Sequence, residues 1–145
     1  MMAAKRWFGW LLLIYGLLIG CAAYQAAGQV QSGRQALLIN KPEDALAYFQ
    51  QVAQTNPNYI FQSENYREGI WTYVGRSQYS LGRLTEARQS LEKALSIYPD
   101  DYLARIYLGL TLMRSGEDSS GSKELASGIQ GLYVWLEYMN RTMPF

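Results

Sequence analysis

Residues 68–101 read EGIWTYVGRSQYSLGRLTEARQSLEKALSIYPDD, and this stretch decides the fold class. Its apolar residues recur at helical spacing on both sides of Gly82, first around Trp71 and then around Leu91. Gly82 supplies the positive φ that ends the first helix, and Pro99 stops the second. The stretch therefore predicts a hairpin of two helices.

Small residues predict how these two helices pack. Gly75 and Ala87 stand where two antiparallel helices must cross most closely. Thr85 is placed to cap the second helix, and Glu86 lies in its first turn near the positive end of the helix dipole. We therefore expect an antiparallel hairpin whose backbones approach each other at Gly75.

The same pattern recurs along the chain at fixed offsets, which indicates a repeat architecture. Four residues match others 42 positions later: Gly33, Asn40, Ala45 and Pro57 match Gly75, Gly82, Ala87 and Pro99. Three residues match others 34 positions later: Gly75, Gly82 and Leu91 match Gly109, Gly116 and Leu125. The longer first step predicts an insertion at about residues 60–67, either a loop that contacts a partner or a lengthened helix capped by Ser63.

The spacing of Trp71, Gly75, Gly82, Ala87 and Pro99 resembles the tetratricopeptide repeat. This resemblance implies an all-α fold, an α-α superhelix of about three helical hairpins that follows an N-terminal hydrophobic helix. The repeat domain is expected over residues 26–131, with repeats at about 26–59, 68–101 and 102–131. The aromatic segment at 132–145 is expected to be a separate capping helix or to meet another chain.

Composition narrows the class of protein. Of 145 residues, 49% are hydrophobic and 17% are charged, which excludes an intrinsically disordered chain. There is no histidine and one cysteine, so zinc sites of the Cys/His type and nucleophiles activated by histidine are excluded. We predict no enzymatic activity, no cofactor and no metal site. The net charge of +1 gives no electrostatic footprint for nucleic acid.

The amino terminus has the pattern of an export signal. Lys5 and Arg6 precede a run of 14 uncharged residues that continues into LIGC at residues 18–21. LIGC resembles the lipobox of bacterial lipoproteins, which implies that Cys21 is lipidated and becomes the new amino terminus. Residues 1–21 are therefore expected to act as a signal or membrane anchor, and an uncleaved transmembrane anchor is the alternative.

The family resemblance also implies an inner groove lined by the first helix of each repeat. Carried over by position, the groove residues are Val30, Arg34, Leu37 and Leu38, then Thr72, Arg76, Tyr79 and Ser80, then Ile106, Leu110, Met113 and Arg114. Arg34, Arg76 and Arg114 are thus expected to place three cations along one groove. Arg76 is expected to leave the core face, so that its removal changes folding little.

These observations predict a membrane-tethered scaffold without enzymatic activity, on the exported (periplasmic) face of a bacterial membrane. Its expected partner is a protein that presents an acidic or carboxyl-terminal segment, and its role is in assembling or stabilising an envelope complex. The alternative is an integral accessory subunit of a larger membrane complex, with the N-terminal helix retained as a transmembrane anchor.

Overall fold

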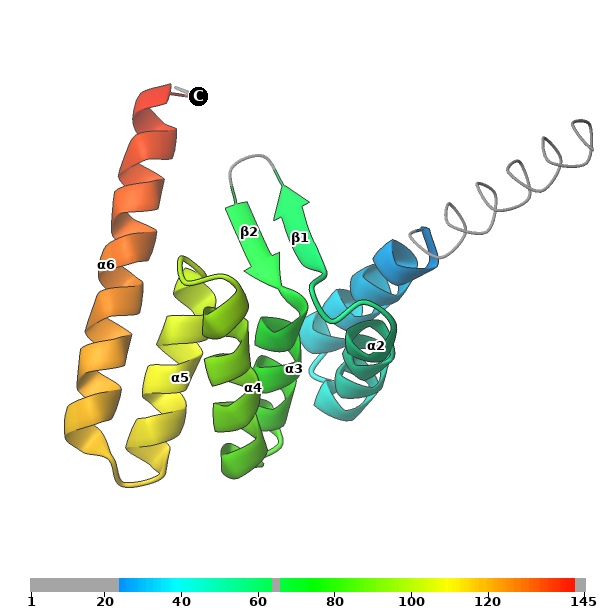
Figure 1. Ribbon diagram of the computed structural model, residues 1–145, viewed down its shortest axis with the longest axis horizontal. Coiled ribbons are helices and arrows are strands. Elements are labelled where there is room, and N and C mark those ends of the chain that lie inside the picture. Colours follow the sequence, from blue (N-terminus) through cyan, green and yellow to red (C-terminus); the bar gives the residue numbers. More distant parts are fainter. Residues whose placement is uncertain (1–23, 64–65, 143–145) are drawn as a thin grey trace, which may run out of the picture.

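The computed structural model describes residues 24–63 and 66–142, which form a row of antiparallel helices stacked side by side (Figure 1). The first described helix covers residues 24–38. It is followed by α2 (Pro42–Thr55), α3 (Ile70–Ser80), α4 (Leu84–Ile97), α5 (Tyr102–Arg114) and α6 (Asp118–Thr142). Helices that are consecutive in the chain contact each other from α2 onward, and α3 also contacts α5. The predicted α-α superhelix of helical hairpins is confirmed.

The turns within the hairpins are those that the sequence predicts. Gly82 and Gly116 have φ values of +73° and +85°, and Asn40 takes the same left-handed region with φ 56°. Pro42 begins α2, where its missing N–H costs no helical hydrogen bond. The predicted cap at Thr85 is wrong, because α4 begins at Leu84 without a side-chain cap.

The insertion at residues 60–67 is not a lengthened helix, so that expectation is wrong; it is not an irregular loop either, and its contact with a partner stays a prediction. It forms an antiparallel hairpin of β1 (Ile60–Ser63) and β2 (Tyr66–Gly69), in which Phe61 pairs with Glu68 (Figure 1). β-Branched and aromatic residues favour extended backbone here. The hairpin leads directly into α3, which starts at Ile70 rather than at residue 68.

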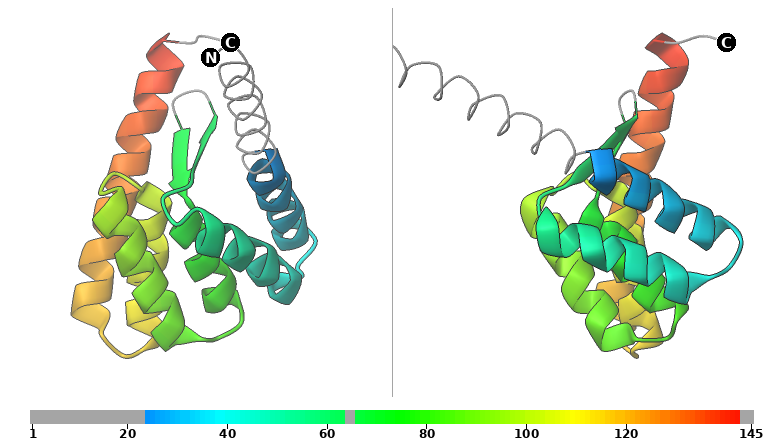
Figure 2. Two further views of the ribbon diagram at one scale, coloured as in Figure 1. Left: turned by 45° about the vertical axis from the view of Figure 1, so that its right-hand side comes forward. Right: turned by 90° about the vertical axis from the view of Figure 1, so that its right-hand side faces the viewer.

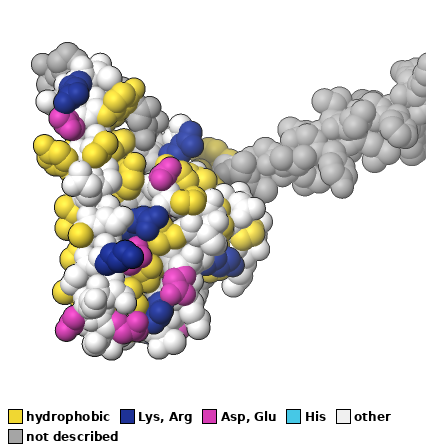
Figure 3. Space-filling view, turned by 60° about the vertical axis from the view of Figure 1, so that its left-hand side comes forward, with side chains coloured by type: hydrophobic (Ala, Val, Ile, Leu, Met, Phe, Trp, Pro, Cys, Tyr) yellow, Lys and Arg dark blue, Asp and Glu magenta, His cyan; other side chains and the backbone are white. Residues whose placement is uncertain are grey.

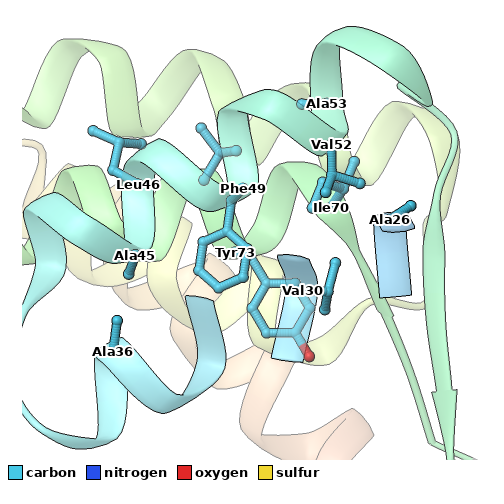
Figure 4. Close-up of a cluster of buried hydrophobic side chains, with 11 residues drawn as sticks. Ala26, Val30, Ala36, Ala45, Leu46, Phe49, Val52, Ala53, Ile70 and Tyr73 are labelled. Carbon is cyan, nitrogen blue, oxygen red and sulfur yellow. The ribbon is translucent and has the colours of Figure 1, made fainter. Parts of the chain in front are cut away.

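The hydrophobic core has two parts that meet at Trp71, which packs against both. The first part joins the 24–38 helix, α2 and α3, and Figure 4 shows Phe49 stacked on Tyr73 at its centre, with ring centroids 4.8 Å apart. Gly33 leaves room for the Phe49 ring, because a Cβ there would lie 2.5 Å from one of its carbons. The second part joins α4 and α5 through Ala87, Leu91, Ala94, Ala104, Leu108 and Leu112.

The predicted separate capping helix at 132–145 is wrong, because α6 is one helix of 25 residues that runs from Asp118 to Thr142. Glycines let α6 lie close to α5. A Cβ at Gly121 would lie 2.7 Å from the carbonyl oxygen of Gly109, and a Cβ at Gly128 would lie 2.9 Å from the backbone nitrogen of Ile106. Glycine has a low helix propensity and therefore disfavours this helix. The packing of α6 against α5 compensates for that cost.

Candidate binding groove

The three arginines predicted for the groove lie on the first helix of each successive hairpin. Arg34 is on the 24–38 helix, Arg76 on α3 and Arg114 on α5. Each guanidinium lies over an aromatic ring, which holds the cation in place by cation–π attraction. The arrangement is an alternating series of arginines and aromatic rings.

Each guanidinium in this series lies within about 6 Å of a ring centroid, the range of cation–π attraction. Arg34 lies 4.3 Å from the ring centroid of Phe61 in the β-hairpin. Arg76 lies between two rings, 5.6 Å from the centroid of Tyr73 and 5.2 Å from that of Tyr107. Tyr107 meets Tyr79 edge to face at 5.6 Å, and Arg114 lies 4.7 Å over Tyr79 and donates to its backbone oxygen. The series therefore runs without a break from Arg76 to Arg114.

Arg76 is bound by a buried carboxylate. Its Nη1 donates to Oε1 of Glu68 at 2.5 Å, and the Glu68 residue is 3% exposed. The hydroxyl of Tyr66 donates to the other oxygen of Glu68 at 3.4 Å. The expectation that Arg76 leaves the core face is therefore wrong, and in place of a small effect on folding we expect its removal to destabilise the fold. Removal of Arg76 would leave a buried charge without its partner.

Burial sets the protonation chemistry of this cluster. Desolvation raises the pKa of Glu68, while the adjacent Arg76 guanidinium opposes that rise. Burial is the largest single influence on Arg76 and disfavours its charged form, but the charge and hydrogen bond of Glu68 together with Tyr107 outweigh it and raise the pKa of that guanidinium. Burial and the neighbouring Glu68 raise the pKa of both Tyr66 and Tyr73, so both phenols keep their protons and act as donors.

A pocket of about 220 Å³ opens beside this ion pair; it is lined by Arg34, Leu37, Leu38, Glu68, Tyr73 and Arg76. Nε of Arg76 is buried and has no hydrogen-bond partner among residues 24–63 and 66–142. Arg34 is half-buried, and no carboxylate in this same part of the chain forms an ion pair with it. The pocket thus combines an apolar wall with donors suited to an anionic group.

Of the four groove residues predicted on α5, two pack against glycines of α6. Ile106 and Met113 lie against Gly128 and Gly121 of α6, so they belong to the α5–α6 contact, although Met113 stays 37% exposed. Leu110 is half-buried and Arg114 is exposed. All four were assigned to the groove from their position in the repeat. Gly121 and Gly128 bring α6 so close to α5 that Met113 and Ile106 pack against α6.

Two other predicted groove residues are core residues. Val30 is 1% exposed, and Thr72 is fully buried and donates to Asp101 at 2.7 Å. Asp101 also accepts from the backbone nitrogens of Gly69 and Ala104, so it caps α5 and fastens the base of the β-hairpin. Asp101 is therefore structural, as its place at a helix start predicts.

The sequence reasoning missed four residues of this site. They are Phe61, Glu68, Tyr73 and Tyr107. Glu68 and Phe61 come from the β-hairpin, which the helical period did not predict. Tyr73 and Tyr107 are 34 positions apart, which is the spacing of the second repeat step, and this match was the signal by which they could have been found.

The anchor predicted at the amino terminus, including Cys21, lies outside the described residues. Among the helices that the structure describes, none has the length and hydropathy needed to span a bilayer. In the same part of the chain, no three His, Cys, Asp or Glu side chains are close enough to hold a metal ion.

A comparison with protein families matches residues 69–101 to the tetratricopeptide repeat. The chain has a tetratricopeptide fold. The match coincides with the stretch in which the helical spacing is clearest, and the outer two hairpins keep the same geometry with fewer of the characteristic residues. A comparison with curated protein sequences gives no match.

Solved structures of tetratricopeptide proteins share this fold. The crystal structure of MamA is 19% identical, with a TM-score of 0.62 over 79% of this chain and 62% of that chain. The TPR2B domain of yeast Sti1, solved in complex with pHsp70, is 14% identical, with a TM-score of 0.63 over 74% of this chain and 80% of that one. An O-GlcNAc transferase mutant from Thermobaculum terrenum is 18% identical, with a TM-score of 0.65 over 76% of this chain and 20% of that one. The chain thus spans less than two thirds of the MamA length.

Proposed function

We propose that this protein is a membrane-tethered scaffold without enzymatic activity that captures a carboxylate-bearing peptide segment of a partner protein on its groove. The tether is the amino-terminal segment with Cys21, which places the repeat domain on the exported face of a bacterial membrane. Its role is to assemble or stabilise an envelope complex.

One observation carries this proposal: the arginines on three successive hairpins all lie against aromatic rings along one face. Arginine and tyrosine are the residues enriched at binding hot spots. The pocket between Arg34 and Arg76 offers the half-buried Arg34, which forms no ion pair among the described residues, beside the apolar Leu37 and Leu38. A peptide carboxylate fits such donors, while an adjacent apolar side chain fits the leucine wall.

The Arg76–Glu68 pair has a defined part in this capture. Because Glu68 already neutralises Arg76, the net attraction for an anion comes from Arg34 and Arg114, while Arg76 holds the centre of the groove rigid. A rigid site loses less conformational entropy when a peptide binds. The solved complex of the yeast Sti1 domain shows that a tetratricopeptide fold of similar shape accommodates a bound partner.

Peptide libraries test the proposal directly. Full-length protein in detergent is screened against random peptides with free carboxyl ends and against the same peptides with amidated ends. We expect selective capture of the free acids. Arg34→Gln should weaken the selected peptides about 10-fold to 100-fold, the loss of one charge-assisted hydrogen bond worth about 1.5–3 kcal/mol.

Arg88→Gln is the matched control, because Arg88 lies on α4, a second helix of a hairpin, and pairs there with Glu92 and Glu117. It should leave peptide affinity unchanged. Equal capture of acid and amide peptides, or equal losses for Arg34→Gln and Arg88→Gln, would show that the groove is not the binding surface.

The alternative function, an integral accessory subunit of a larger membrane complex, is favoured by a different observation. The second half of α6 exposes Tyr133, Val134, Leu136 and Tyr138, each by more than half. Isolation of the native complex distinguishes the two functions. A stoichiometric subunit stays with its neighbours in detergent, while a scaffold that captures peptides exchanges with free peptide.

A further inference from the structure

The β-hairpin carries two contacts to the groove on one cross-strand pair. Phe61 of β1 and Glu68 of β2 lie directly opposite each other, so their side chains share one face of the sheet. The ring of Phe61 lies against Arg34 of the first described helix. The carboxylate of Glu68 binds Arg76 of α3. The pair therefore joins the arginines of the first two helical hairpins.

The base of this β-hairpin is fixed to the helical stack. The backbone nitrogen of Ile70 donates to the backbone oxygen of Tyr59 at 2.9 Å, so the two chain segments stay paired below the strands. The backbone nitrogen of Gly69 donates to the buried carboxylate of Asp101 at 2.9 Å. The left view of Figure 2 shows the strands between the 24–38 helix and α6. The cross-strand pair is therefore held at a set position beside the groove.

Arg34 is held by a ring and not by a carboxylate. Its guanidinium lies 4.3 Å from the ring centroid of Phe61, and no ion pair of the described residues includes it. Other arginines differ, because Arg88, Arg105 and Arg141 each pair with a glutamate. Figure 3 shows one face of the molecule on which basic side chains lie beside acidic ones. The cation–π contact restrains the Arg34 guanidinium and leaves its charge to an incoming anion.

The charges that line the pocket indicate which anion fits it. The pocket of about 220 Å³ is lined by Arg34, Arg76 and Glu68, together with two leucines and Tyr73. Tyr73 keeps its proton, because burial and the adjacent Glu68 raise its pKa. Glu68 and Arg76 neutralise each other, so the positive charge of Arg34 remains. A carboxylate carries a single negative charge and matches it, whereas a phosphate ester carries about −1.5 to −2 at pH 7.

We propose that Phe61 is a positioning residue for ligand binding: it holds the Arg34 guanidinium so that its planar N–H donors bind one carboxylate of the partner peptide, in a pocket whose charge disfavours a phosphate. This role rests on the proposed capture of a carboxylate-bearing peptide, and it makes that capture selective. A guanidinium that is already restrained loses less side-chain entropy when the carboxylate binds. The insertion at residues 60–67 thus takes part in binding through a contact within the chain.

Peptide capture by ring variants tests this role. Full-length protein in detergent is given three pools of random peptides that lack Asp and Glu: one with free carboxyl ends, one with amidated ends, and one with amidated ends and a phosphoserine. Phe61→Leu removes the ring but keeps an apolar side chain against the core, and Phe61→Tyr keeps the ring. Ile60→Val is the matched control, because Ile60 is the neighbouring residue of β1 and lies on the other face of the sheet.

We expect the parent to capture the free-acid pool about 10-fold better, or more, than the amide and phosphoserine pools. Phe61→Leu should weaken capture of the free-acid pool by about 3-fold to 10-fold, the loss of one cation–π contact. Phe61→Tyr and Ile60→Val should leave it unchanged. In the Arg34→Gln background Phe61→Leu should cause no further loss, because the ring acts through that guanidinium.

Full capture by Phe61→Leu, with weakened capture by Arg34→Gln, would overturn the role of Phe61 and leave the proposed function standing. An undiminished further loss in the Arg34→Gln background would show that Phe61 is merely structural, which also overturns the role. Equal capture of the phosphoserine and free-acid pools would overturn the selection by charge. A parent that shows no preference for free acids over amides would refute the proposed function and this role together.

Discussion

The buried pair of Glu68 and Arg76 makes the most quantitative prediction about this fold. Glu68 is 3% exposed, and its charge is compensated by one guanidinium at 2.5 Å. Arg76→Met keeps an apolar stem but removes the guanidinium that lies over the rings of Tyr73 and Tyr107. Breaking a buried pair by removing one partner costs about 3–5 kcal/mol. We therefore expect Arg76→Met to lower the free energy of unfolding by about 3 kcal/mol or more.

A double-mutant cycle separates the loss of charge from the loss of packing. Glu68→Gln in the Arg76→Met background removes the uncompensated carboxylate and should recover most of the stability. Arg88→Met is the control, since Arg88 pairs with Glu92 and Glu117 at the surface and surface pairs contribute little. Urea unfolding followed by circular dichroism measures five chains: the parent, Arg76→Met, Glu68→Gln, the double variant and Arg88→Met. Equal stability of Arg76→Met and Arg88→Met would refute the assignment of Arg76 to a buried pair.

Three further predictions concern the helix packing, the effect of pH on stability and the proposed anchor. Gly75→Ala should destabilise the fold by about 1–3 kcal/mol, because its Cβ would lie 2.5 Å from Cγ of Leu91. Gly28→Ala, which has open space around it, should stabilise the fold by about 0.5–1 kcal/mol. Similar melting temperatures for the two variants would contradict this packing. Burial raises the pKa of Glu68 above its ordinary value of 4.5, so the folded protein binds a proton more readily than the unfolded chain. The melting temperature measured by calorimetry should therefore rise as the pH falls from neutral toward 4.5. It should rise less in Glu68→Gln. Cys21→Ser should leave an uncleaved precursor that takes up no labelled palmitate, and unchanged mobility and labelling would refute the lipidated anchor.

The hairpins of this fold were predictable because their residues act through local geometry. The turn at Gly82 requires a positive φ, and the contact at Gly75 requires a residue without a side chain. Both requirements follow from the spacing along one helix and its neighbour. For the same reason Asn40 and Gly116 revealed the flanking turns, although the outer hairpins carry fewer of the characteristic residues.

The electrostatics of the groove were not predictable in the same way. Glu68 is buried only because the β-hairpin folds back over α3, and a two-stranded sheet of four-residue strands gives little periodic signal. The continuity of α6 was missed because Gly128 and Gly131 lower helix propensity. Their small size is what lets α6 pack on Ile106 and Tyr102, and this gain is visible only when both helices are seen together.

Photo-crosslinking in the membrane tests whether partners bind on the face made by the first helices of the hairpins, as we propose. A photoreactive phenylalanine analogue is placed at Leu38 or Ser80 on that face, and at Gln54 or Gln89 on the second helices, all four being exposed. We expect one partner to be crosslinked from Leu38 and Ser80, and Arg34→Gln to abolish both adducts. The same partner crosslinked from Gln54 and Gln89, and not from the groove positions, would contradict it.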